Sequence, residues 1–202
     1  VFVTTVSFGS SVITSNGIQD IFIVKLNTNG EVQWAHNGGG TGGDIGNGIA
    51  VDKNGAVYIT GHFASTAHFG SITLSATGAA DAFIAKYNTS GDIQWARGTG
   101  GSNTDYGYSI SIDNNSNVYV TGTFIETIKF GSTTLTSDNA PDIFVAKYNT
   151  NGDVQWAQQA GGVRQVSGNK IATDLNGNVY VSGYFTESAM FGITELTSVG
   201  DL

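Results

Sequence analysis

Tryptophan recurs in this chain at a spacing that could serve binding chemistry. Trp34, Trp95 and Trp156 each close a phrase of the form NTxGxxQWA. One indole per repeated unit could form a platform for sugar rings. A Trp that returns at one structural position is also what packing between repeated units requires. Because Val or Ile shares a strand face with each Trp, the pattern favours packing over a ligand platform.

A second recurring set consists of acidic turns with the pattern Asp-x-Asn. Oxygen-rich calcium loops place carboxylate and amide oxygens at such alternating positions. Each turn here runs directly into a strand without the later bidentate Glu, and Asp and Asn also form ordinary hairpin turns. We therefore prefer the turn interpretation and keep calcium as an alternative. The candidate ligands are Asp52, Asn54, Asp113, Asn115, Asp174 and Asn176.

Three lysines recur in mid-strand, on the faces that also carry Ile or Val: Lys25, Lys86 and Lys147. A cation in an apolar strand needs a partner, so the pattern predicts one structural salt bridge per unit with a repeated Asp. The histidines are not repeated, and no Ser/His/Asp set or acid pair recurs in a catalytic arrangement. We expect no catalytic residue, no bound organic cofactor and no enzyme activity.

The composition narrows the class of protein further. Charged residues make up 12% of the chain, Gly occurs 29 times and Pro once, which favours strands joined by tight turns. The net charge of −8 with eight Lys and Arg in all argues against nucleic-acid binding, which needs clustered cations. No apolar run is long enough to span a bilayer. The absence of Cys excludes disulfides and thiolate metal sites.

A repeat of 61 residues positions all of these side chains. Asp20, Asp81 and Asp142 open strand-like runs at this spacing, and residues 81–97 and 142–158 share 12 of 17 positions. Alternating hydrophobicity predicts four strands in one unit, joined as two hairpins by turns containing Gly. An inserted FG…LTS segment is expected to add one short strand and a loop. The expected strands are 48–52, 56–63, 81–88 and 92–98, with the insertion at 69–78.

A four-stranded unit of this size cannot bury both of its faces alone and must stack on its neighbours. We therefore expect an all-β fold of tandem four-stranded blades, arranged like a β-propeller, with an open superhelical stack of blades as the alternative. Residues 1–202 form one repeat domain of about three and a third units, approximately 1–45, 46–106, 107–167 and 168–202. A closed propeller needs at least four blades, so we expect a segment of a longer chain or one part of an assembly.

The combined phrase GxxIAVDxxGNVYVTGxF…DxFVAKYNxxGxxxWA resembles the bacterial β-propeller repeat family known as SBBP repeats. Residues 46–63, 107–124 and 168–185 carry its first half, and 20–35, 81–96 and 142–157 its second. The resemblance implies a propeller-type domain of a large secreted or cell-surface bacterial protein, and it supplies no catalytic residues. The FG…LTS insertion departs from the family pattern.

These observations predict a non-catalytic scaffold outside the cell or on its surface. It would be adhesive or structural and could assemble into a larger surface structure or filament. The alternative is a propeller that binds a ligand through carbohydrate- or calcium-dependent contacts. Expected partners are further repeats of the same chain or other copies of it, glycans and surface proteins. We expect a specific partner to be recognised by the stretches that differ between units, which are 64–68, 125–129 and 186–190.

Overall fold

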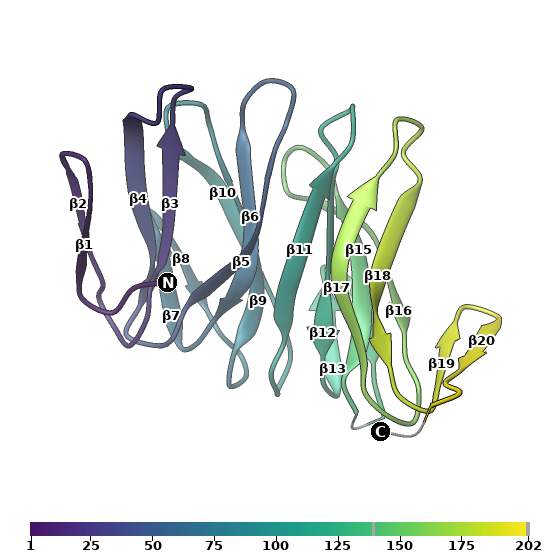
Figure 1. Cartoon of the computed structure of the whole chain (residues 1–202). Helices are drawn as coiled ribbons and strands as arrows, with labels where there is room; N and C mark the ends of the chain where they lie inside the picture. Colours follow the sequence, from purple (N-terminus) through teal and green to yellow (C-terminus); the bar gives the residue numbers. More distant parts are fainter. Residues whose placement is uncertain (139, 201–202) are drawn as a thin grey trace.

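The computed structural model describes residues 1–138 and 140–200 and shows an all-β protein (Figure 1). Twenty strands are present, and those two ranges contain no helix. Accordingly, no helix in the described part of the chain could cross a membrane. The strands form where apolar and small polar residues alternate, and Asn, Asp, Ser and Gly fill the turns between them.

The middle of the chain forms two complete blades, each an antiparallel sheet of four strands. Each blade consists of two hairpins that pair side by side, as the 61-residue pattern predicts. The expectation of four-stranded, propeller-like blades is confirmed. The strands of the two blades are β5 (Ile45–Val51), β6 (Val57–Phe63), β9 (Asp81–Tyr87) and β10 (Ile93–Thr99), and β11 (Tyr106–Ile112), β12 (Val118–Phe124), β15 (Asp142–Tyr148) and β16 (Val154–Ala160).

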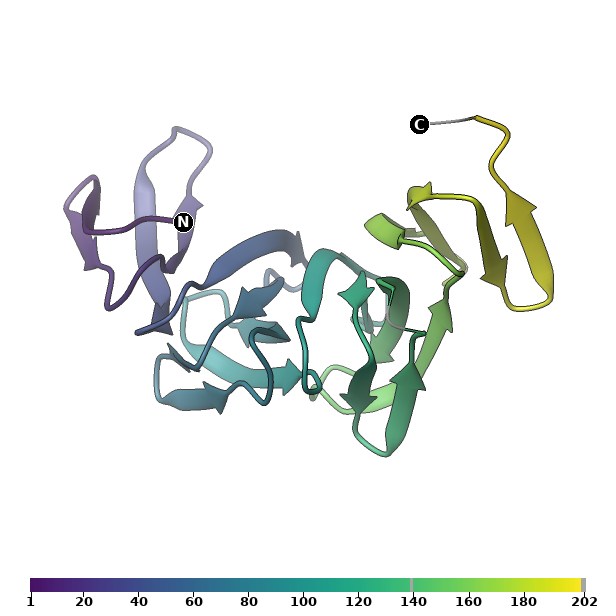
Figure 2. The same cartoon turned by 90° about the horizontal axis from the view of Figure 1, so that it is seen from below.

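Half-blades flank the two complete blades. The first half-blade holds the equivalents of the third and fourth strands, and the last holds the equivalents of the first and second. The units follow one another along an open arc and do not form a closed ring within the described residues (Figure 2). The half-blades are β3 (Ile21–Leu26) with β4 (Val32–Gly40), and β17 (Val166–Thr173) with β18 (Val179–Phe185).

Each FG…LTS insertion is a complete hairpin and not the single strand with a loop that the sequence suggested. The hairpin closes because Gly70 and its equivalents adopt a left-handed conformation, with a φ of 58° at Gly70. In the second unit this hairpin pairs with the end of β4 in the preceding unit. The insertion therefore ties each blade to the one before it. The hairpins are β1 (Thr5–Phe8) with β2 (Ser11–Thr14), β7 (Thr66–Phe69) with β8 (Ile72–Ser75), β13 (Thr127–Phe130) with β14 (Thr133–Thr136), and β19 (Ser188–Phe191) with β20 (Thr194–Thr197).

The hydrophobic core lies between blades as well as within them. One buried cluster joins Tyr58, Ile84 and Trp95 of the first complete blade to Val118 and Phe144 of the second. Because the two faces of a blade are buried against different neighbours, strands such as β6 and β12 are buried along almost their whole length. This burial explains why these strands contain near-continuous apolar and small residues.

Candidate functional site

Two of the repeated tryptophans, Trp34 and Trp95, lie at the junctions between successive units. The indole Nε1 of Trp34 donates a hydrogen bond to the carbonyl oxygen of Thr89, 3.1 Å away, in the next unit. Trp95 donates in the same way to Thr150, at 3.0 Å. In both cases the acceptor is the backbone of the turn in the NTxG phrase, which joins the third and fourth strands of the following blade.

The acceptor turn is held in shape by its own side chains. Asn88 Oδ1 accepts hydrogen bonds from the backbone N–H groups of Ser90 and Asp92, each at 2.9 Å. Gly91 adopts a φ of 88°, and a Cβ there would lie 2.9 Å from the ring of Trp34. The Gly thus satisfies both the turn conformation and the close approach of the indole. In the second and third copies of the NTxG phrase, the turn is thus bound by side chains of the preceding unit.

The repeated lysines bind the same turns as the tryptophans. The prediction of one salt bridge per unit is therefore wrong. Lys25 Nζ lies 3.0 Å from the same carbonyl oxygen of Thr89, and Lys86 Nζ lies 3.2 Å from that of Thr150. Lys86 also lies over the ring of Tyr58, 5.1 Å from its centroid. The one salt bridge in the described ranges joins Arg164 to Glu187 and involves none of these lysines. We call each Trp and Lys with the Thr carbonyl that they hold a turn clasp.

The exposed fraction of each indole depends on whether a turn, a Tyr ring or both lie against it. Trp95 has both a turn in front of it and Tyr58 beside it at 6.1 Å, and it is 7% exposed. Trp34 has the turn, Trp156 has Tyr119 at 6.1 Å, and each of these two is half-buried. The structure thus places Trp34 and Trp95 between successive units, and the ligand platform stays a prediction.

The Asp-x-Asn turns use their carboxylates within the turn. Asp113 Oδ1 accepts from the backbone N–H groups of Asn115 and Asn117, and its Oδ2 accepts from the hydroxyl of Tyr119 at 3.1 Å. Partial burial acts to raise the pKa of Asp113, but these bonds outweigh it and hold the pKa below its ordinary value. Asp52 and Asp174 make equivalent bonds. The described residues contain no group of three or more acidic or His side chains arranged for a metal, and the calcium alternative stays a prediction.

Two pairs of buried acids, Asp20 with Asp44 and Asp81 with Asp105, were not recognised in the sequence. Asp81 and Asp105 are 3% and 0% exposed, and their charges interact across the junction between the two complete blades. Burial raises the pKa of Asp105 to about 7. The Asp81 carboxylate accepts from the backbone and hydroxyl of Thr77 at 3.0 Å. The only signal in the sequence is an Asp in the Gly-rich bridge, 24 residues after the Asp that opens the third strand.

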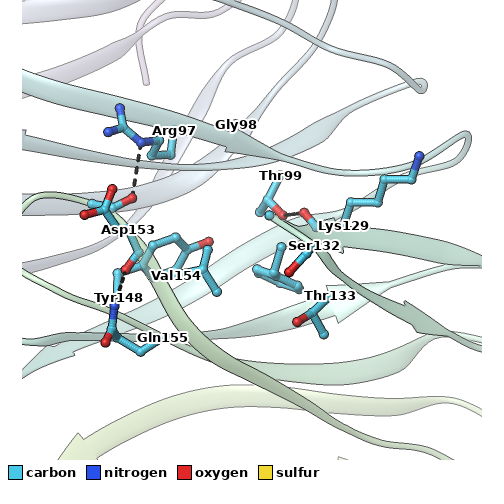
Figure 3. A pocket seen from close by; sticks show the side chains of 13 residues that line it. Arg97, Gly98, Thr99, Lys129, Ser132, Thr133, Tyr148, Asp153, Val154 and Gln155 are labelled. Carbon is cyan, nitrogen blue, oxygen red and sulfur yellow. Dashed lines mark hydrogen bonds between the residues drawn. The ribbon is translucent and has the colours of Figure 1, made fainter.

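A cleft opens beside the turn clasp at the same junction (Figure 3). Its volume is about 380 Å³, and its polar lining includes Arg97, Lys129 and Asp153. Arg97 Nε donates to the carbonyl oxygen of Gly152 at 3.2 Å, so this guanidinium also holds the neighbouring turn. The Lys129 side chain comes from the inserted hairpin of the next unit, β13–β14.

An equivalent cleft of about 570 Å³ lies one junction earlier, where His36 and His68 take the places of the two cations. In the following unit these positions are Gln158 and Met190. Residues 68, 129 and 190 belong to the variable stretches that the sequence marked as candidate partner contacts. The junction clefts therefore combine a repeated framework with a lining that changes from unit to unit.

The four-stranded blades, their tandem arrangement and the clasped junctions define a β-propeller-type repeat protein. The SBBP beta-propeller repeat model matches residues 33–62, 94–123 and 155–184, so the chain carries three repeats of this family. The resemblance seen in the sequence is confirmed. Each match begins in the fourth strand of one unit and ends in the second strand of the next.

Two curated proteins are similar to this chain. The uncharacterized WD repeat-containing protein L264 of Acanthamoeba polyphaga mimivirus is 28% identical over 205 residues, which cover 88% of this chain and 15% of that protein. Regulatory protein FlaEY of Caulobacter vibrioides is 27% identical over 110 residues, covering 52% of this chain and 12% of that protein. The chain thus spans at most 15% of the length of these relatives.

Proposed function

We propose that this chain is a non-catalytic interaction scaffold, secreted or displayed on a cell surface, with an adhesive or structural role. The observation that carries the proposal is that repeated residues and variable residues have different places in the structure. Those that repeat every 61 positions hold turns and junctions together, as Trp95, Lys86 and Asp113 do. Those that differ between units line the junction clefts, as Lys129 does. A variable lining on a constant frame suits recognition.

The chemistry of the cleft in Figure 3 supports binding more than catalysis. The hydroxyl of Thr99 donates to the carbonyl oxygen of Lys129, and the Arg97 guanidinium donates to three backbone carbonyls. These groups are thus engaged in holding the junction. A location outside the cell is supported by the acidic composition, rich in Thr, Gly and Asn.

Carbohydrate binding is the second candidate. The clefts are a better location for it than the tryptophan platform. A volume of about 380 Å³ falls within the range of small-ligand sites. Tyr148, Lys129 and Asp153 belong to the residues that line the same space. Such a combination could recognise one sugar unit of a surface glycan.

The test measures binding and turnover together. The chain is immobilised and exposed to a glycan array and to purified envelope polysaccharides, beside the variants Lys129→Ala and Lys170→Ala. Lys170 is an exposed lysine of β17, so its loss changes the net charge equally without touching the cleft. We expect binding that Lys129→Ala weakens about tenfold and Lys170→Ala leaves intact. Cleavage of a bound glycan would contradict a non-catalytic role, and equal losses in both variants would contradict the cleft.

A further inference from the structure

Each of the two junction clefts has a buried tyrosine at its closed end. We call the cleft of about 570 Å³, between the half-blade β3–β4 and the first complete blade, the first junction cleft, and the cleft in Figure 3 the second. Tyr87 lines the first cleft and its equivalent Tyr148 lines the second, and each of these side chains is 2% exposed. A residue that lines a cleft and is nevertheless buried lies at the closed end of that cleft.

The hydroxyl groups of these two tyrosines have different surroundings. The hydroxyl of Tyr148 interacts with the hydroxyl of Thr99, and the Arg97 guanidinium lies near it. The residue equivalent to Thr99 in the first cleft is Gly38, which has no side chain to offer. The hydroxyl of Tyr87 is buried and finds no hydrogen-bond partner within the described residues. A buried hydroxyl without a partner destabilises the fold, and a ligand that supplies the partner recovers that loss.

A second buried polar atom in the first cleft also has no partner in the described part of the chain, the Nε2 atom of His36. Its equivalent Arg97 donates to two carbonyl oxygens of the neighbouring turn. The shorter imidazole instead lies against the glycine of the turn, and a Cβ at Gly91 would be 2.5 Å from Nε2. The rings of His36 and Tyr87 are nearly parallel, with centroids 6.4 Å apart. The two groups without partners are therefore neighbours in one cleft.

The rest of the lining of the first cleft is polar and carries little charge. Among the described residues that line it there is no Lys or Arg, and Asp92 is the one carboxylate. His68, Asn16 and Ser71 add an imidazole, an amide and a hydroxyl, and Ile93 adds an apolar surface. Imidazole, amide and hydroxyl groups both donate and accept hydrogen bonds. The hydroxyl groups of a sugar also do both, and its ring has apolar C–H faces, so this lining matches the chemistry of a sugar.

Other classes of ligand fit the first cleft less well. An anionic ligand would meet the carboxylate of Asp92 without a Lys or Arg to balance it. A metal ion needs several ligands arranged around one point, and the residues that the structure describes hold no group of three acidic or His side chains suited to one. A volume of about 570 Å³ lies within the range of small-molecule sites. A neutral sugar is therefore the ligand class that the lining favours.

We propose that the first junction cleft binds a neutral sugar unit of a polysaccharide, and that the Tyr87 hydroxyl and His36 Nε2 bind hydroxyl groups of this sugar. Both atoms are covered by their neighbours in the structure, so the side chains around them shift slightly when the sugar enters, as is common at binding sites. The inference rests on the proposed scaffold function. It assigns a ligand class to a cleft other than the one that Lys129→Ala probes.

The test makes the same substitution in the two clefts. The unchanged chain, Tyr87→Phe and Tyr148→Phe are exposed to an array of neutral and acidic glycans, and the neutral glycan that is retained most strongly is titrated by calorimetry. Each variant loses one hydroxyl and keeps its ring, and Tyr148→Phe is the matched control because Tyr148 lines the second cleft. We expect Tyr87→Phe to bind the neutral glycan about tenfold more weakly, as the loss of one hydrogen bond predicts, and Tyr148→Phe to bind it unchanged.

A second measurement needs no ligand. Tyr87→Phe removes a hydroxyl that has no partner in the described protein, so its melting temperature should equal or exceed that of the unchanged chain. Tyr148→Phe removes a hydroxyl that interacts with Thr99 and should melt about 2–4 °C lower. If Tyr87→Phe melts as low as Tyr148→Phe, the Tyr87 hydroxyl is already satisfied in the free protein, for example by a water molecule, and the inference fails.

Three results on the array would also overturn the inference. If no neutral glycan is retained, the first cleft is not a site for neutral sugars. If binding falls in Lys129→Ala and Tyr148→Phe but not in Tyr87→Phe, the sugar occupies the second cleft, and the proposed scaffold function stands while this inference fails. If EDTA abolishes the binding of neutral glycans, a metal ion on the imidazoles carries the contact in place of the hydrogen bonds assigned to Tyr87 and His36.

Discussion

The indole Nε1 of Trp95 lies 3.0 Å from the carbonyl oxygen of Thr150, so a side chain of one blade is bonded to the backbone of the next. The bond lies beside a hydrophobic cluster that spans both blades. The junction is therefore part of the core, and its loss affects the folding of two units at once.

Replacing the fully enclosed indole is expected to cost much more than replacing its half-enclosed equivalent. Trp95→Ala should lower the free energy of unfolding by about 3–5 kcal/mol, because it leaves a cavity and removes one of the two hydrogen bonds that the carbonyl oxygen of Thr150 accepts. Trp156→Ala should cost about 1–2 kcal/mol, because Trp156 is half-buried. Urea unfolding at 1 µM protein measures both. Equal losses would contradict the wedge role of Trp95.

The buried acid Asp105 is expected to make stability fall as pH rises. Its pKa is raised by burial from 3.8 to about 7, so between these values the folded state holds a proton that the unfolded state releases. The slope for one proton is at most about 1.4 kcal/mol per pH unit. Asp105→Asn should remove this component. Between pH 4.5 and pH 7.5 the free energy of unfolding should therefore fall less in the variant than in the unchanged protein. Urea unfolding across this range measures the slope, with the exposed Glu195→Gln as control. An unchanged slope in Asp105→Asn would contradict the prediction.

Removal of a turn carboxylate is expected to destabilise the hairpin that it closes. Asp113→Ala deletes acceptors for two backbone N–H groups and for the hydroxyl of the buried Tyr119, a loss of about 1–3 kcal/mol. Asp113→Asn retains one acceptor oxygen and should cost less. Thermal unfolding of the two variants in parallel measures the difference. Similar losses in both would show that the carboxylate charge matters more than the hydrogen bonds.

Removal of divalent cations tests the calcium alternative for the same turns. Because the carboxylate oxygens already accept hydrogen bonds within the turn, we expect the melting temperature to be the same with 5 mM EDTA and with 5 mM CaCl₂. A chelator-dependent decrease that disappears in Asp113→Asn would establish calcium binding at this turn.

The glycine in the middle of β12 is expected to tolerate no side chain. A Cβ at Gly122 would lie 1.8 Å from the carbonyl oxygen of Tyr106 and 2.9 Å from the ring of Phe144. Gly122→Ala should therefore cost about 3 kcal/mol or prevent folding. Gly43→Ala, where a Cβ would meet nothing within 4 Å, should change the stability by less than about 1 kcal/mol. Soluble yield and urea unfolding measure both, and a stable Gly122→Ala protein would contradict the packing.

The sequence predicted the blades well because their strands obey local rules. Alternating apolar residues, a Gly in each turn and a strict spacing of 61 residues define β6, β9 and their equivalents without reference to distant contacts. The role of Trp95 could also be predicted, since a repeated large aromatic residue at one position serves the packing of repeats.

Three features could not be predicted because they depend on the backbone or on distant contacts. Lys86 resembled one half of a salt bridge, but its partners are a carbonyl group and an aromatic ring. Backbone acceptors carry no signature in a sequence. The inserted hairpin depends on a left-handed Gly70, which resembles an ordinary loop glycine. Asp105 becomes an unusual acid only after the fold buries it beside Asp81.

Because the turn clasp binds a carbonyl oxygen, it hardly constrains the side chains of the turn that it holds. The residue after the bonded Thr is Ser90 at one junction and Asn151 at the next, and the hydrogen bond keeps its length within 0.1 Å. Neighbouring units are thus interchangeable parts. A gene that gains, loses or reorders whole units would still encode junctions that fit, and the lining of the clefts could diversify while the joints stay the same.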